Sequence, residues 1–310
     1  MMPPPANVSV ALPVGQAIER MKRVLFQPFD LGKWFTIGFC AWLANLGRSR
    51  FQGNYHFGSG HGSGADQVRE WVEKTRDYVT NNLVWILPLA AVLLVLGIAI
   101  WVLLIWVSSR GRFMFLHCVA LDKADVAAPW REFAREANSL FWFRLVVGLA
   151  GLVAILPLAA VMVIRGWRML ERGQPSVGGI LELVCVGLLL TLVAAVFCIV
   201  AKLTTDFVVP IMFRRGEGCL QGWGTLLGLV AGNLGRFVLY LIFQIILALA
   251  IAVLILTAVL ATCCIFGCLA AIPYVGTVLL LPIYVFRRAY SIHYLAQYGS
   301  DYDVFHLQQQ

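Results

Sequence analysis

Charged side chains are scarce in this sequence. Only 13% of its 310 residues are Asp, Glu, Lys or Arg, whereas 60% are hydrophobic. Because a soluble domain carries about 25% charged residues, this chain has about half the charge that a water-facing surface needs. Together with a mean hydropathy of +0.82, the composition excludes an ordinary soluble protein and indicates one whose solvent is the lipid bilayer.

Catalytic signatures are absent as well. The sequence contains no HExxH zinc motif, no Walker phosphate loop, no GxSxG nucleophile elbow and no dinucleotide fingerprint. We therefore expect no enzyme and no cofactor. The net charge of +8 is explained by basic residues that face the cytoplasm, so it does not indicate nucleic-acid binding.

Metal ligands in a suitable arrangement are also missing. His56 and His61 lie in the Gly-rich segment 53–64, which has no apolar period and is typical of a flexible linker. Five of the eight cysteines are isolated, and we interpret them as small hydrophobic side chains. The other three cluster at 263–268 without a nearby histidine or a second thiol pair. We expect no metal site.

Long apolar runs are what the sequence does have. A helix needs about 20 apolar residues to cross a hydrocarbon core about 30 Å thick. Six segments are candidates, namely 31–46, 83–107, 140–164, 177–201, 237–265 and 270–286. The first is short, so an interfacial or re-entrant segment is an alternative to a tilted span. The prediction is an all-α, polytopic transmembrane bundle of about six spans in three hairpins.

Basic residues suggest the orientation. With six spans and a cytoplasmic N-terminus, cytoplasmic segments hold about twice as many Lys and Arg residues as the others. We therefore expect a multi-pass protein of the cell membrane, in a bacterium the inner membrane, with both termini in the cytoplasm. With five spans, one terminus would change sides. The segment before the first span contains four charged residues, so it does not resemble a cleaved signal peptide.

Amphipathic segments separate the spans. In residues 14–29, Val14, Ile18, Met21 and Leu25 recur at helical spacing, and Arg20 is on the polar side with other charges. Such a basic helix can rest on anionic lipid, so we expect membrane lipids to be contacted. We divide the chain into an N-terminal tail with this helix (1–30), a transmembrane domain that includes the Gly-rich loop 47–65 (31–298), and a polar C-terminal tail (299–310).

A glycine stripe indicates close helix packing. Gly224, Gly228 and Gly232 are spaced by four residues and therefore share one helical face. Small residues at this spacing let helices approach closely in membranes. The partner is either another helix of this chain, a second copy in a homo-oligomer or another membrane protein.

Few polar side chains lie in or beside the apolar runs. Gln244 is inside the fifth span, while Lys202 and Asp206 end the fourth and are four residues apart, the spacing of a helical ion pair. Ionisable groups in a membrane are costly and are often functional. These three could line a cavity in a transporter, or they could serve as an interhelical hydrogen bond and an interfacial anchor.

Three short segments, 28–35, 207–212 and 287–290, carry a resemblance to known proteins. Through them the chain resembles an uncharacterised family of bacterial membrane proteins. It is also distantly similar to the membrane domain of some glycerophosphodiester phosphodiesterases, but the catalytic barrel of those enzymes is absent. The resemblance implies a membrane fold and carries over no functional residue.

Two functions stay open at this point. The first is a non-enzymatic membrane component that organises partners or lipids. The alternative is a transporter or lipid-handling protein with a cavity between the helical hairpins, near Gln244, Asp206 and Lys202. Substrate, oligomeric state and physiological role do not follow from the sequence.

Overall fold

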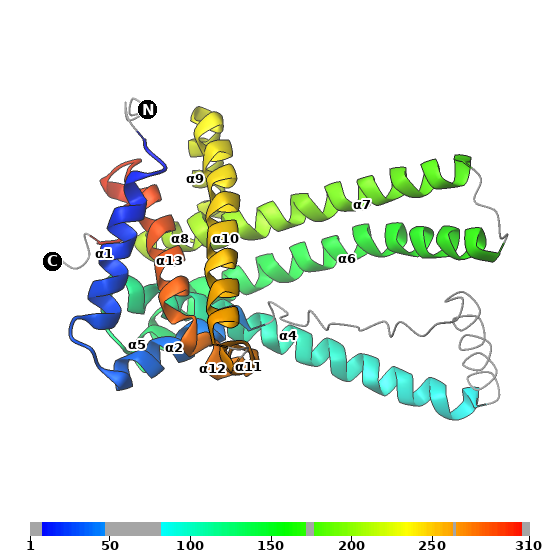
Figure 1. The fold of residues 1–310 in the computed structure, drawn as a ribbon, viewed down its shortest axis with the longest axis horizontal. Helices are drawn as coiled ribbons and strands as arrows, with labels where there is room; N and C mark the ends of the chain where they lie inside the picture. Colours follow the sequence, from blue (N-terminus) through cyan, green and yellow to red (C-terminus); the bar gives the residue numbers. More distant parts are fainter. Residues whose placement is uncertain (1–7, 47–81, 172–176, 263–264, 306–310) are drawn as a thin grey trace. The chain divides into compact units, whose positions relative to one another are not determined.

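The computed structural model describes residues 8–46, 82–171, 177–262 and 265–305, which form helices and no strand (Figure 1). The all-α class is therefore confirmed. The helices are α1 (Leu12–Phe26), α2 (Leu31–Asn45), α4 (Leu83–Leu121), α5 (Ala127–Glu132), α6 (Ala134–Glu171), α7 (Val177–Leu203), a π-helical turn (Thr204–Val208), α8 (Val209–Arg215), α9 (Cys219–Gly232), α10 (Leu234–Ala261), α11 (Ile265–Ala271), α12 (Pro273–Leu279), α13 (Leu281–Ala296) and a 3₁₀ turn (Ser300–Tyr302).

The chain folds into two compact units. The first comprises Met1–Leu46, Ile105–Leu145 and Ile199–Gln310, and the second comprises Gly47–Leu104 and Val146–Cys198. Three long helices, α4, α6 and α7, contribute residues to both units. The expected Gly-rich loop, with His56 and His61, lies outside the described residues.

Within the described ranges, four helices are long and apolar enough to cross a membrane: α4, α6, α7 with its continuation to Arg215, and α10. Helices α12 and α13, bent by 63°, give a fifth if the pair is one span. Four or five of the roughly six expected spans are thus found among the described residues, and the expected first span falls short because α2 has only 15 residues. At 1.5 Å per residue it is about 22 Å long, short of a core about 30 Å thick.

The helices of the second unit expose apolar side chains along their length. Val84 is 83% exposed, Val153 71% and Val177 84%. A soluble protein does not leave such large apolar surfaces open to water. Such surfaces suit a lipid environment, and the long apolar helices suggest a multi-pass membrane protein.

The first unit, by contrast, has a packed core. Helix α1 lies along α13 there, with Ala17 and Val24 fully buried (Figure 1). The expected apolar stripe is partly displaced, since Ile18 is 39% exposed and Arg20 only 6%. Arg20 was expected on the polar face, but its guanidinium turns inward to bind the end of α4. The segment that follows α13 also joins this core, because Val304 is fully buried.

Helix α2 packs closely against the C-terminal part of α4. A Cβ atom built at Gly111 would lie 2.6 Å from the backbone nitrogen of Ala44 and 2.6 Å from the carbonyl carbon of Leu43. The hydroxyl of Ser108 donates to the Ala44 carbonyl at 3.0 Å. Only glycine permits this approach, because a methyl group here meets backbone and cannot be relieved by a rotamer change.

We expect Gly111→Ala to lower the free energy of unfolding by about 2 kcal/mol, the cost typical of overpacking a filled core. Gly97→Ala is the matched control on the same helix, since a Cβ there meets no atom of the described residues within 4 Å. Alanine favours helix over glycine, so the control should be neutral or slightly stabilising. Unfolding in mixed SDS micelles measures both, and equal stabilities of the two variants would contradict this packing.

Candidate functional site

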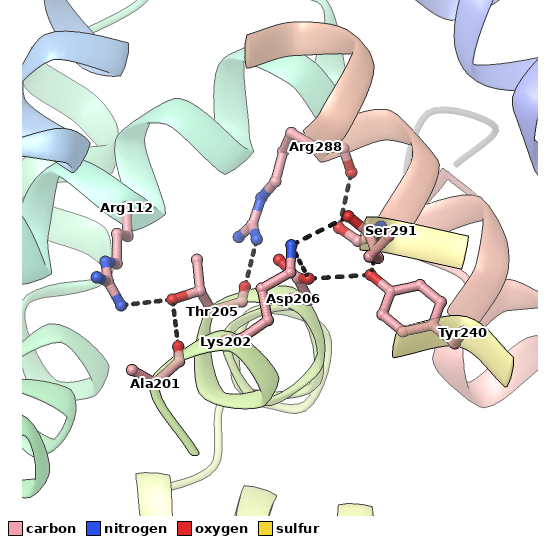
Figure 2. A network of polar contacts seen from close by, with 9 residues as sticks. Arg112, Ala201, Lys202, Thr205, Asp206, Tyr240, Arg288 and Ser291 are labelled. Atoms are coloured by element: carbon pink, nitrogen blue, oxygen red, sulfur yellow. Dashed lines mark hydrogen bonds and ion pairs between the residues drawn. The ribbon is translucent and has the colours of Figure 1, made fainter. Parts of the chain in front are cut away.

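A π-helical turn at Thr204–Val208 carries the candidate site and interrupts the helix between α7 and α8. Pro210 explains the turn: its ring has no N–H and clashes with the carbonyl four residues back, at Asp206, so the regular α-helical register cannot continue. π-turns of this kind are frequent at functional sites. Here the turn places Thr205 and Asp206 among side chains from α4, α10 and α13 (Figure 2).

Four side chains form a closed polar ring, which we define as Lys202, Asp206, Tyr240 and Gln244. Lys202 Nζ lies 2.6 Å from Asp206 Oδ2, and the Tyr240 hydroxyl donates to the same oxygen at 2.9 Å. Gln244 Nε2 donates to the Tyr240 hydroxyl at 3.1 Å, and Lys202 Nζ donates to Gln244 Oε1 at 3.2 Å. Each member is therefore bound to two others.

The ring is largely shielded. The Asp206 side chain is 11% exposed and that of Lys202 is 23% exposed, while Tyr240 is fully buried. Aromatic rings surround Tyr240, with the Phe207 ring centroid at 4.8 Å and the Tyr294 centroid at 4.6 Å. Burial strengthens these electrostatic contacts and also makes each of them costly to lose.

Two arginines hold the turn itself. Arg288 on α13, only 7% exposed, donates from Nη1 to the Thr205 carbonyl. Arg112 on α4 donates from Nη1 to the Thr205 hydroxyl at 2.8 Å, and this hydroxyl donates to the Ala201 carbonyl at 2.8 Å (Figure 2). The wide π-turn leaves a carbonyl without its usual helical partner, and an arginine side chain supplies the missing donor.

The three predicted polar residues thus meet at one place. The spacing of Lys202 and Asp206 predicted their ion pair, and the structure confirms that contact. Sequence reasoning missed Tyr240, Arg112 and Arg288. The signal for Tyr240 was its position four residues before Gln244 on one face of α10, whereas nothing local linked the two arginines to the turn.

The predicted glycine face behaves differently. Gly224, Gly228 and Gly232 are exposed on α9, and a Cβ built at any of them meets no atom within 4 Å in the part of the chain that the structure describes. Another glycine, Gly222, is where α9 approaches the π-turn, since its Cβ would lie 3.0 Å from Val208 Cγ1. The close packing expected for the stripe is therefore not found within the described residues.

A separate cavity of about 400 Å³ also belongs to the first unit. Its lining shares no residue with the polar ring and consists of Arg135, Glu136, Ser139, Gly216, Glu217, Gly218, Leu220 and Gln221. Ser139 Oγ accepts from the backbone nitrogen of Cys219 at 2.9 Å, which ties α6 to the start of α9.

The site offers little for catalysis or metal binding. Asp206 is neutralised by Lys202 and held by Tyr240, so it is not placed as a free base. Among the described residues, no group of three or more His, Cys, Asp or Glu side chains could hold a metal ion. Cys263 and Cys264 lie outside the described residues, and Cys268 is a free, exposed thiol.

One comparison with known proteins identifies a relationship. The model of a family of unknown function (DUF7544) matches residues 9–285, from just before α1 to within α13. No curated protein and no solved structure matches the chain. The matched stretch contains the π-turn and all four members of the polar ring. The chain belongs to this family of unknown function, DUF7544.

Proposed function

We propose that this protein is a non-enzymatic component of the cell membrane that organises lipids or partner proteins at the membrane surface. The observation that carries the proposal is helix α2. It is too short to span, yet it exposes Leu31, Phe35 and Phe39 at intervals of four residues, to 60%, 49% and 36%. An exposed apolar face of this kind indicates a helix that lies along the interface with its apolar side in lipid.

Aromatic side chains around α2 support this placement. Trp34 contacts Phe26 at 5.3 Å and Phe29 at 5.6 Å, and Trp42 contacts Tyr274 at 6.3 Å, all between ring centroids. Trp and Tyr concentrate where membrane meets water. The same cluster includes residues of the segment 28–35 on which the resemblance to a bacterial membrane family rests.

The polar ring favours the organising role over a role in transport. The four side chains of the ring bind one another, and none of them lines the 400 Å³ cavity. A permeation path needs ionisable groups that face water or substrate. Here the groups join α7 to α10, as expected of a structural contact.

Orientation is part of the proposal. We place the protein in the cell membrane, a bacterial inner membrane, with both termini in the cytoplasm, which requires an even number of crossings such as the four long apolar helices provide. The support is the excess of Lys and Arg residues that the sequence places in cytoplasmic segments when both termini are cytoplasmic.

Spin-label depth measurements test the proposal. Leu31→Cys, Phe35→Cys and Phe39→Cys, each labelled with a nitroxide in lipid vesicles, should all lie near headgroup depth and within a few ångströms of one another. Leu93→Cys, in the apolar part of α4, gives the deep reference, and the exposed Glu19→Cys gives the aqueous one. A background without the exposed native thiols of Cys185, Cys198 and Cys268 is required.

A spanning α2 would give a different result. Leu31 and Phe39 are eight positions apart, so their depths would differ by about 12 Å, with Phe39 approaching the depth of Leu93. That outcome would overturn the surface placement of α2.

Transport or lipid handling is the second candidate, because Lys202, Asp206 and Gln244 do come together. Native mass spectra of the same purified protein distinguish the two functions. One recurrent small molecule or lipid bound to a monomer would support transport. A defined oligomer or a bound protein, without a stoichiometric ligand, would support the organising role and direct attention to Gly224, Gly228 and Gly232.

A further inference from the structure

Two cysteines that are far apart in sequence lie side by side in the core of the first unit. Cys40 on α2 and Cys118 on α4 are both fully buried, and their sulfur atoms are 3.9 Å apart. The Cys118 thiol also contacts the Asp125 carbonyl at 3.8 Å. We propose that Cys40 and Cys118 are a modification site, a dithiol that a peroxide converts reversibly into a disulfide.

The surroundings hold the two thiols together. One turn after Cys40, the backbone of Leu43 and Ala44 rests on Gly111 without space for a methyl group, and Ser108 bonds to the Ala44 carbonyl at 3.0 Å. Both helices are therefore fixed near the pair. In a disulfide the two sulfur atoms are about 2.05 Å apart, so they must approach each other from their present contact distance. Rotation about the Cα–Cβ bonds can supply this movement when the Cβ atoms are already close.

The reaction balances when hydrogen peroxide is the oxidant. One thiol attacks the O–O bond, which breaks; the sulfur becomes a sulfenic acid, and hydrogen peroxide leaves one water molecule. The second thiol then attacks this sulfur, forming the S–S bond and releasing the hydroxyl group as a second water. Two thiols have lost two electrons and two protons, and one peroxide has been reduced to two waters. A small thiol reductant reverses the change by exchange.

The bond would tie α2 to α4 across 78 positions of the chain. Closing so long a loop restricts the unfolded chain strongly, so the oxidised protein should unfold at a higher denaturant concentration. On the proposed placement of the N-terminus and α2, the pair lies on the cytoplasmic side, a reducing compartment where it is a dithiol by default. Its oxidation then reports peroxide at the membrane.

Peptide mapping of the full-length protein in native membrane vesicles tests the proposal. Vesicles are treated with hydrogen peroxide, free thiols are blocked with N-ethylmaleimide, and the protein is digested without reductant. We expect a Cys40–Cys118 linked peptide that disappears on treatment with dithiothreitol, and an upward shift of the unfolding midpoint. Cys40→Ser and Cys118→Ser should each abolish the link and the shift.

Cys219 provides the internal control, because it is 1% exposed in the same core. Dimedone added during oxidation labels it once peroxide reaches buried thiols. Cys219 labelled with no Cys40–Cys118 link would overturn the proposal. Prolonged exposure that modifies neither site would also overturn it, since the pair would then be closed to peroxide. A link from Cys40 or Cys118 to any other cysteine would show that the pairing is wrong.

Discussion

Asp206→Asn should destabilise the protein by about 3 kcal/mol or more, the loss expected when one partner of a buried ion pair is removed. Asparagine keeps the size of the side chain but removes the charge that neutralises Lys202, and it weakens the acceptor of the Tyr240 hydroxyl. The free energy of unfolding in mixed SDS micelles measures the loss.

Glu217→Gln is the matched control for this substitution. Glu217 also faces a basic partner, Arg215 at 3.9 Å, but both side chains are about one third exposed, at 32% and 30%. Exposed pairs contribute about 0.2–1 kcal/mol, so the control should remain close to the original stability. Equal losses for Asp206→Asn and Glu217→Gln would show that the ring is not a buried electrostatic unit.

The double variant Lys202→Met, Asp206→Leu separates a structural from a functional ring. Removing both charges avoids the unpaired buried charge, so this variant should be more stable than Asp206→Asn alone. A structural ring predicts that the double variant retains any lipid or partner binding found by native mass spectrometry. Loss of a bound small molecule in a stable double variant would instead support the transport alternative.

Arg20→Ala should cost about 3 kcal/mol, because Arg20 binds the C-terminal end of α4. Its Nε donates to the Val119 carbonyl at 3.0 Å and its Nη2 to the Ala120 carbonyl at 2.7 Å. The last carbonyls of a helix have no partner within the helix and carry partial negative charge, so a cation is favourable there. The guanidinium also lies 5.0 Å from the centroid of the Phe305 ring.

Burial lowers the pKa of Arg20 from its ordinary value, while the nearby Asp122 acts in the opposite direction. The lowered pKa means that folding removes this charge from water at a cost, which the bonds to α4 offset. Arg20→Lys should therefore recover only part of the stability, since an ammonium group cannot reproduce the forked donors of a guanidinium.

Arg23→Ala on the same helix is the control. Arg23 is 56% exposed and pairs with Glu19 at 3.6 Å, so its loss should change stability by less than about 0.5 kcal/mol. Thermal unfolding in detergent, followed by circular dichroism, compares the three variants. An Arg20→Ala protein as stable as Arg23→Ala would show that the end of α4 does not depend on this contact.

The sequence by itself determined the class of this protein. Apolar runs in a chain with 13% charged residues require helices in a bilayer, because no other backbone structure satisfies its hydrogen bonds within one lipid-exposed segment. Local spacing also predicted the contact of Lys202 with Asp206 and the amphipathic character of α1. These features depend on residues three or four positions apart, which helical geometry alone brings together.

Only the tertiary structure decided the remaining features. Arg20 was expected on a polar face but is buried, because the end of α4, about 100 residues away, offers it two carbonyls. Gly222 rather than the predicted stripe approaches the π-turn, and Cys40 meets Cys118 instead of lying isolated. The physical reason is the same in each case: contacts between distant segments depend on which helix faces pack together, and no local period encodes that choice.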